Sequence, residues 1–179
     1  LIECAESNAA IGIVGPLSNS AAFQSVPRRH DTQGKWARNP LPRGWSPDDM
    51  AAAIAAASQA DFPEVGVLNG FCLGIKRRVI DVIGYFDEEL FPDGYGEEYD
   101  YCLRARKAGF MLAVADHAYV YHAGTRSYLA EQRDLLKQSA MARLRSRHSN
   151  KRIRKAIELT FENPSLKHMR KAVATLAVD

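Results

Sequence analysis

A long apolar segment constrains the fold of this chain most. Residues Val65 to Ile75 form a run of eleven residues that only Asn69 interrupts. The run is too short for a membrane helix, which needs about 20 apolar residues, and its length and composition favour a buried strand. Glycines recur in it at regular spacing, and they let other backbone or a ligand approach a strand closely. We therefore predict a central strand over residues 65–75.

The residues before this segment predict a short strand, a long loop and a helix. Alternating β-branched residues and glycine over 11–15, followed by Pro16, indicate a strand that ends in a loop. Residues 17–44 are rich in Ser, Asn, Pro, Arg and Gly, and a connection of that length is usually functional. The sequence Ser46-Pro-Asp-Asp49 then supplies an N-cap, a first-turn proline and two acids, so we predict a helix to about Ala60.

The residues after the segment predict helices separated by two short strands. We expect helices over 76–83 and 97–108, where glycines supply the stops, and strands over 111–115 and 118–122. Three further helices follow, over 129–148, 150–162 and from Asn163 onward. The order predicts an α/β body with a mixed sheet over residues 1–128 and a helical tail over 129–179.

The charge divides at the same place. Residues 1–128 carry 12 basic and 16 acidic side chains, whereas residues 129–179 carry 12 basic and 5 acidic ones. The basic tail could contact anionic lipid headgroups or another polyanion. The alternative is a set of helices that pack on the body with a solvated basic face.

Several function classes lose support. The cysteines, Cys4, Cys72 and Cys102, are odd in number and show no CxxC spacing, which argues against a disulfide framework and a zinc site. The same cysteine usage favours a reducing compartment, so we expect a cytoplasmic protein. No signal peptide is visible after Leu1. The chain also has no P-loop, HExxH, GxGxxG or GxSxG pattern.

The densest group of carboxylates lies where a glycine-rich loop becomes the predicted helix at 97. Carboxylates in a first helical turn feel the positive end of the helix dipole, so Glu97 or Glu98 could act as a base or a ligand. Helix capping is the alternative role. His122 follows the predicted strand over 118–122, where an imidazole can bind metal or phosphate or make a structural hydrogen bond.

Together these motifs resemble the family-2 glycosyltransferases in order and spacing, from about Ile11 through Ser127. The resemblance rests on Gly70-Phe-Cys-Leu-Gly-Ile-Lys-Arg77, Gly84-Tyr-Phe-Asp-Glu-Glu-Leu-Phe91, Gly96-Glu-Glu-Tyr-Asp-Tyr-Cys-Leu-Arg104, Ala108-Gly109 and Val120-Tyr-His122. It implies a GT-A fold and transfer of a sugar, with inversion, from a nucleotide-diphosphate donor to an acceptor hydroxyl. It also implies a divalent cation, Mg²⁺ or Mn²⁺, in the complete enzyme.

The resemblance further implies roles for individual residues. Glu98 matches the family's base, although the family usually has Asp there, and this departure leaves Glu97 and Asp100 as substitutes. His122 matches a metal or diphosphate contact. Asp87, Glu88 and Gly70 fall on the acceptor side, with a turn role equally open for the two acids.

One part of the family pattern is missing. Its nucleotide-binding half normally ends in an Asp-x-Asp motif before the segment that resembles residues 11–16, and no Asp-x-Asp occurs in this chain. The chain therefore resembles the acceptor-side half of a transferase domain, and we expect no transfer, and no bound cation, from it alone.

The resemblance also sets the expected partners. They are a nucleotide-diphosphate sugar and a saccharide or lipid-linked acceptor of cell-surface polysaccharide or glycolipid synthesis, at the inner face of the membrane. Exposed sheet edge would allow copies to pair. Few aromatic residues occur in the tail, so we expect no nucleic acid. The alternative function is a non-catalytic α/β module that binds polyanions through its basic helices.

Overall fold

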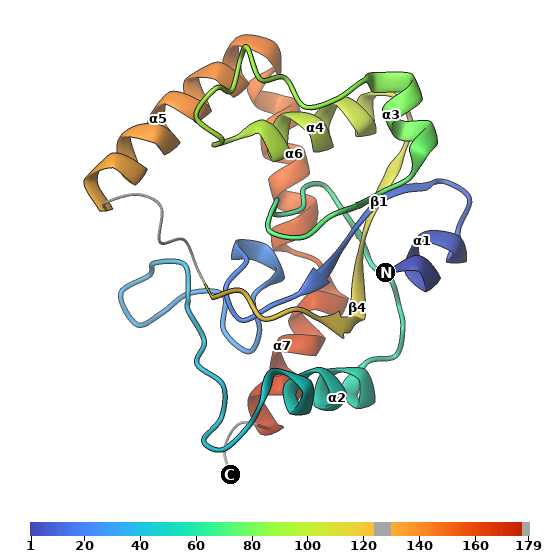
Figure 1. Cartoon of the computed structure of the whole chain (residues 1–179), viewed down its shortest axis with the longest axis vertical. Coiled ribbons are helices and arrows are strands. Elements are labelled where there is room, and N and C mark those ends of the chain that lie inside the picture. The colour runs from blue at the N-terminus through green and yellow to red at the C-terminus, as the bar shows by residue number, and fades with distance from the viewer. Residues whose placement is uncertain (124–129, 177–179) are drawn as a thin grey trace.

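The computed structural model describes residues 1–123 and 130–176, without the side chains of residues 130–134. A mixed four-stranded sheet lies at its centre (Figure 1). Its strands are β1 (Ile11–Leu17), β2 (Glu64–Val65), β3 (Gly74–Ile75) and β4 (Met111–Tyr119). The order is β2-β4-β1-β3, in which β1 and β4 run parallel and both edge strands run antiparallel to their neighbours. The protein is therefore an α/β protein with a mixed sheet, as predicted.

Helices occupy the positions that the sequence indicates. They are α2 (Pro47–Ala57), α3 (Arg77–Ile83), α4 (Glu97–Lys107), α5 (Ala130–Arg147), α6 (Asn150–Phe161) and α7 (Pro164–Leu176), and an unpredicted α1 (Ile2–Ser7) precedes them. A one-turn 3-10 helix, Ala22–Gln24, interrupts the long loop. The start of α2 is a capping box: the Asp49 N–H donates to the Ser46 hydroxyl, and the Ser46 N–H donates to the Asp49 carboxylate.

The prediction of a central strand over 65–75 is wrong. Only its two ends are strands, and they lie at opposite edges of the sheet. Between them the backbone bonds to side chains instead of a neighbouring strand: Thr160 Oγ1 accepts from the N–H groups of Gly66 and Val67 at 2.9 and 3.1 Å. Residues 65–68 are buried, whereas residues 69–75 are half-buried or, at Gly70, exposed. Side-chain acceptors from distant elements make the burial of residues 65–68 possible without a strand ladder.

The prediction of two strands over 111–115 and 118–122 is also wrong. A single strand, β4, spans Met111–Tyr119, and an irregularity near its end places Ala115 opposite Pro16 but Tyr119 opposite Leu17. The predicted break between residues 115 and 118 coincides with this irregularity. His122 consequently lies three residues beyond the strand.

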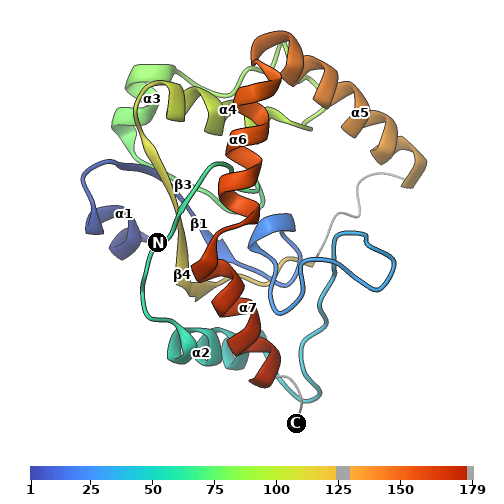
Figure 2. The ribbon, with the colours of Figure 1, turned by 180° about the vertical axis from the view of Figure 1, so that it is seen from behind.

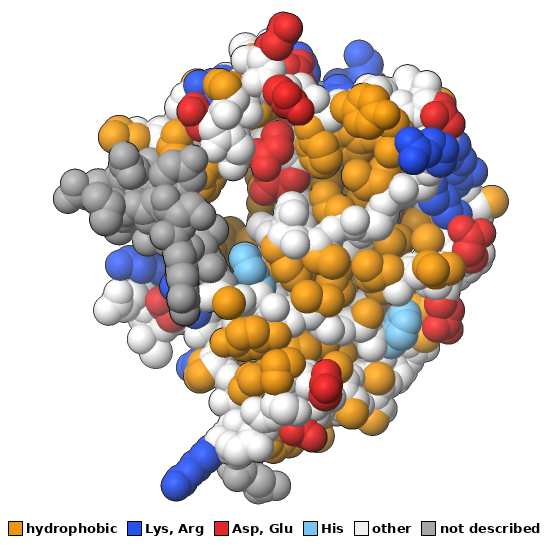
Figure 3. Space-filling model, in the orientation of Figure 1, with side chains coloured by type: hydrophobic (Ala, Val, Ile, Leu, Met, Phe, Trp, Pro, Cys, Tyr) orange, Lys and Arg blue, Asp and Glu red, His pale blue; other side chains and the backbone are white. Residues whose placement is uncertain are grey.

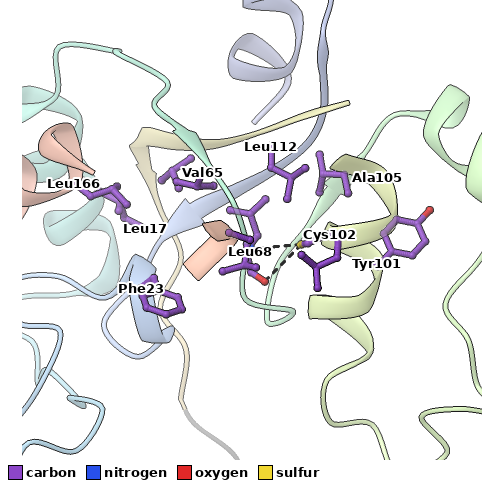
Figure 4. Packing of buried hydrophobic residues seen from close by; sticks show 14 of the residues in the cluster. Leu17, Phe23, Val65, Leu68, Tyr101, Cys102, Ala105, Leu112 and Leu166 are labelled. Atoms are coloured by element: carbon purple, nitrogen blue, oxygen red, sulfur yellow. Dashed lines mark hydrogen bonds between the residues drawn. The ribbon is translucent and has the colours of Figure 1, made fainter. Parts of the chain in front are cut away.

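The two faces of the sheet differ in bulk. Ile13, Leu17, Leu112 and Val114 point into the main core, together with side chains from α2, α4, α6 and α7. The opposite face carries small residues such as Ala113 and Ala115 under α1. Figure 2 shows α6 and α7 lying across the sheet. Figure 4 shows Leu68 in the main core beside Cys102, whose sulfur bonds to the Leu68 backbone.

The basic helices use their apolar faces for this packing. Ile153 and Ala156 of α6 and Leu166, Met169 and Val173 of α7 belong to the same buried cluster as Ile13 and Leu17. The contact between α6 and the 66–73 segment is at backbone distance, because a Cβ on Gly66 would lie 2.1 Å from the Ala156 carbonyl oxygen. These helices therefore pack on the body. Among the described residues, no helix is long and apolar enough to cross a membrane.

Candidate functional site

Asp100, one of the three candidate bases, is a structural residue. Its carboxylate is fully buried and accepts from Arg104 Nε at 2.8 Å, Arg147 Nη1 at 3.1 Å and His148 Nε2 at 2.7 Å. A carboxylate that accepts from two arginines and a histidine and is closed to solvent cannot reach an acceptor hydroxyl. The prediction that Asp100 can substitute for the base is therefore wrong, and its role is to attach α5 to α4.

Glu98 lies in different surroundings. It forms part of the wall of a cavity of about 580 Å³ between α4, α5, α6 and the long loop. No Lys, Arg or His of the described residues forms an ion pair with its carboxylate. Figure 3 shows acidic side chains and a histidine at the border of a hollow in one face of the molecule. Glu98 is thus a half-buried carboxylate that faces a cavity, with no ion pair to a cation of the described residues.

The surroundings of Glu98 weaken its acidity. Burial and, secondly, the charge of Glu97 raise the pKa of Glu98 from 4.5 to about 7, against a smaller opposing effect of backbone N–H groups at the start of α4. A carboxylate with a pKa near neutrality is populated in both protonation states at physiological pH. This is the property that a general base needs, and perturbed carboxylates in clefts are typical of functional sites.

Aromatic residues of the long loop form the wall opposite. Trp36 stacks on His30 with ring centroids 4.7 Å apart, and Phe23 meets Trp36 edge-on at 5.0 Å. Phe161 of α6 continues this wall at 6.5 Å from Phe23. Trp36 is 44% exposed, so part of its ring is open to a ligand. An apolar aromatic cavity with few polar groups is the usual form of a small-molecule site.

Gly70 lies directly beneath the candidate base. A Cβ at this position would lie 3.2 Å from Cβ of Glu98, so glycine leaves the room that the Glu98 side chain occupies. The next residue, Phe71, stacks on the His122 ring at 5.3 Å with an interplanar angle of 21°. The structure thus joins Glu98 and His122 through two consecutive residues, although His122 does not line the cavity.

His122 is held in a defined orientation. Its Nδ1 lies 2.6 Å from the carbonyl oxygen of Ser20. Because a carbonyl can only accept, Nδ1 carries the proton and the lone pair of the neutral ring is on Nε2. The backbone of His122 also makes two hydrogen bonds to the side chain of Asn19. The His122 N–H donates to Asn19 Oδ1, and Asn19 Nδ2 donates to the His122 carbonyl oxygen. This geometry suits a single metal or phosphate contact.

The residues present do not complete a cation site. Within residues 1–123 and 130–176, no group of three or more His, Cys, Asp or Glu side chains is arranged to hold a metal ion. Of the predicted site residues, His122 would supply one ligand. A cation expected from the family resemblance would need further ligands from outside this set.

The remaining predicted acids do not line the cavity of Glu98. Glu97, Asp87 and Glu88 line a separate shallow hollow, and one Glu97 carboxylate oxygen is buried without a hydrogen-bond partner among the described residues. Asp87 accepts from the Leu90 N–H and from Arg147, and these contacts lower its pKa. Asp87 therefore caps a turn and binds α5, which is the structural alternative that the sequence left open.

Sequence reasoning missed part of the cavity lining. His30, Phe161 and Lys137 come from three separate segments, and nothing in their local sequence indicates a shared wall. Asn69 also lines the cavity, and it is the polar residue that interrupts the apolar run. A polar residue within an otherwise apolar segment was the available signal for it.

Comparison with known proteins gives relatives without an assigned activity. The chain is similar to the uncharacterized protein Rv1525 of Mycobacterium tuberculosis and the uncharacterized protein Mb1552 of Mycobacterium bovis. Each is 31% identical over 81 residues, which cover 45% of this chain and 31% of the relative. The matched region thus spans about a third of the length of these relatives. No model of a protein family matches the chain, and no solved structure matches it.

Proposed function

We propose that this chain is the acceptor-side portion of an inverting glycosyltransferase with a GT-A fold, similar to the family-2 enzymes, with Glu98 as its general base. The observation that carries the proposal is the position of Glu98, whose pKa is about 7, on the wall of an aromatic cavity of about 580 Å³. The motifs of residues 70–77, 84–91 and 96–104 support it, because the structure brings Gly70 and Glu98 into contact.

The chemistry requires one base from this chain. An acceptor hydroxyl attacks the anomeric carbon of the donor, its proton passes to a Glu98 oxygen, and the bond from that carbon to the diphosphate breaks. The diphosphate leaves as an anion, so no second carboxylate is needed as an acid, in contrast to a glycosidase. Trp36 and Phe161 would contact the apolar face of the acceptor sugar, and Asn69 and Lys137 would bond to its hydroxyl groups.

The proposal assigns the donor to a further part of the enzyme. A nucleotide-binding half with an Asp-x-Asp motif would hold the nucleotide and, with His122, a divalent cation that stabilises the leaving diphosphate. The acceptor would be a saccharide or lipid-linked precursor of a surface polysaccharide, and the enzyme would act at the cytoplasmic face of the membrane.

Nucleotide release by the complete protein tests the proposal. Purified protein is incubated with a panel of UDP- and GDP-sugars and candidate acceptors, and the released nucleotide is measured. Glu98→Gln should lower kcat about a hundredfold or more with little change in KM for the donor, since a general base contributes on that scale.

Asp81→Asn, an exposed acid on α3, is the matched control and should leave the rate unchanged. A Glu98→Gln protein with wild-type turnover would remove Glu98 from the mechanism. Failure of every nucleotide sugar in the panel would count against the transferase assignment itself.

A further inference from the structure

A second concave surface lies between the end of α4 and the start of α6. Its volume is about 460 Å³, and its lining carries no carboxylate. Five cationic side chains line it: Arg106, Lys107, Lys151, Arg152 and Lys155. We call these residues the basic pocket.

Most of this charge has no carboxylate partner in the described part of the chain. Arg106 pairs with Glu64 at 2.8 Å, but no carboxylate of the described residues pairs with the other four cations. Other basic residues of the same helices do have acidic partners: Arg143 with Asp93, and Arg154 with Glu158. Arg145 and Lys171 also have no carboxylate partner among the described residues, but they do not line this surface. What distinguishes the basic pocket is that four such cations line one concave surface.

The start of α6 makes the accumulation of cations more unusual. The first turn of α6 contains no acidic residue and contains Lys151 and Arg152. Cations are disfavoured at the positive end of a helix dipole, and Lys151 and Lys155 repel each other at i,i+4 spacing. Ser149 caps the turn by accepting from the Arg152 N–H, and the N–H groups that remain free in a first helical turn favour a bound anion. A ligand with negative charge would therefore turn three unfavourable contacts into favourable ones.

The basic pocket is separate from the cavity of Glu98. Lys107 lies nine residues after Glu98, or roughly 13 Å along α4 at about 1.5 Å per residue. Leu103 contacts both spaces and lies between them. An anion in the basic pocket would thus not meet the candidate base, and the inference does not depend on the proposed function.

We propose that the basic pocket binds a phosphate-bearing ligand with two or more negative charges. Lysine and arginine side chains from two helices, with the N-terminus of α6, supply donors on several sides of such a group. The ligand is either a soluble phosphorylated compound or a phosphomonoester lipid headgroup, and both present the same group to the pocket.

Binding of pyrophosphate to this chain, measured by calorimetry at low salt, tests the proposal. Lys151→Gln/Lys155→Gln should weaken binding at least about tenfold, because two charge-assisted hydrogen bonds are lost. Arg154→Gln/Lys171→Gln changes the net charge equally but removes no lining residue, and it should alter the affinity by less than about twofold. Lys107→Gln, from the other helix, should also weaken binding.

Vesicles identify the source of the phosphate. Phosphatidylcholine vesicles with added phosphatidic acid are compared with phosphatidylcholine alone in a sedimentation assay on the same variants. Binding to the phosphatidic acid vesicles that is lost in Lys151→Gln/Lys155→Gln supports a lipid source, and pyrophosphate binding without vesicle binding supports a soluble one.

Three results would overturn the proposal. The first is no binding of either pyrophosphate or phosphatidic acid. The second is an equal loss of affinity in the two double variants, which would show a diffuse effect of net charge. The third is tight oligonucleotide binding that both double variants weaken equally, with no pyrophosphate binding, which would assign the tail a polymeric partner. Melting temperatures establish that each variant is folded.

Discussion

At the scale of the residue, the pKa of Glu98 links the candidate site to the stability of the fold. The pKa is about 7 in the folded chain and 4.5 for an ordinary glutamate. Folding therefore favours the protonated form, so the free energy of unfolding should fall as the pH rises from 4.5 through 7. The loss relative to the Glu98→Gln variant should be about 3 kcal/mol at pH 8, from about 1.4 kcal/mol per pKa unit.

Chemical denaturation at a series of pH values measures this difference. The wild type and Glu98→Gln should have similar stability near pH 4, and the variant should be the more stable protein at pH 8. If the free energy of unfolding depends on pH in the same way in both proteins, Glu98 has an ordinary pKa and lacks the property expected of the general base. NMR titration of the Glu98 side-chain carboxyl carbon gives its pKa directly.

Asp100 provides the contrasting carboxylate. Removing its charge by Asp100→Asn leaves Arg104, Arg147 and His148 around a neutral group, and loss of one partner from a buried ion pair costs roughly 3–5 kcal/mol. Asp93→Asn removes the exposed partner of Arg143 and should cost less than about 1 kcal/mol. Urea unfolding of both variants makes the comparison, and equal costs would mean that the Asp100 cluster is not a structural anchor.

The two carboxylates show what the sequence could and could not predict. The motif at 96–104 identified the acids at the start of α4, and a helix starts there as expected. Their separate roles depend on α5, which brings Arg147 and His148 to Asp100 from about 50 residues away. No local pattern around Asp100 carries that information.

At the scale of the element, the close approach of α6 to the 66–73 segment is the most demanding contact. Gly66→Ala would place a methyl group against the backbone of Ala156, which cannot move without displacing α6. We expect a loss of about 3 kcal/mol or more in the free energy of unfolding. Gly34→Ala has open space around its Cβ but a φ of +76°, so it should cost only about 1 kcal/mol.

Thermal unfolding of both glycine variants checks this order. A Gly66→Ala protein no less stable than Gly34→Ala would mean that α6 does not rest on this segment.

The same segment explains the failed strand prediction. Its apolar residues indicated burial, which holds for residues 65–68 but not for residues 69–75. Thr160 and Cys102, which accept from its backbone, are far away in sequence.

At the scale of the whole molecule, the helices beyond residue 149 complete the main core. Ile153, Leu166, Met169 and Val173 are at most 8% exposed. Burial of such side chains contributes roughly 1.5–3 kcal/mol each, and their sum is comparable with the 5–15 kcal/mol stability of a typical domain. A chain that ends at Ser149 should therefore lose cooperative unfolding, as measured by circular dichroism.

A peptide of residues 150–176 added to the shortened chain should restore the transition. A shortened chain that unfolds cooperatively at the wild-type midpoint would show that the body folds without these helices.

The periodicity of the sequence correctly predicted helices in this region. The sequence left open whether these helices contact a lipid surface or pack on the body, because an amphipathic face does not specify what covers it.

The loop over residues 28–45 is fastened at its base independently of the cavity that it helps to form. Asn39 donates to the carbonyl oxygens of Asn19 and Arg28, and the Ala37 N–H donates to the carbonyl of Arg29. Trp36 and His30 project from this tied base, whereas Glu98 is fixed by α4. If the proposed function holds, ligand preference and chemical step are encoded in separable stretches of the chain, and evolution can exchange one stretch without rebuilding the other.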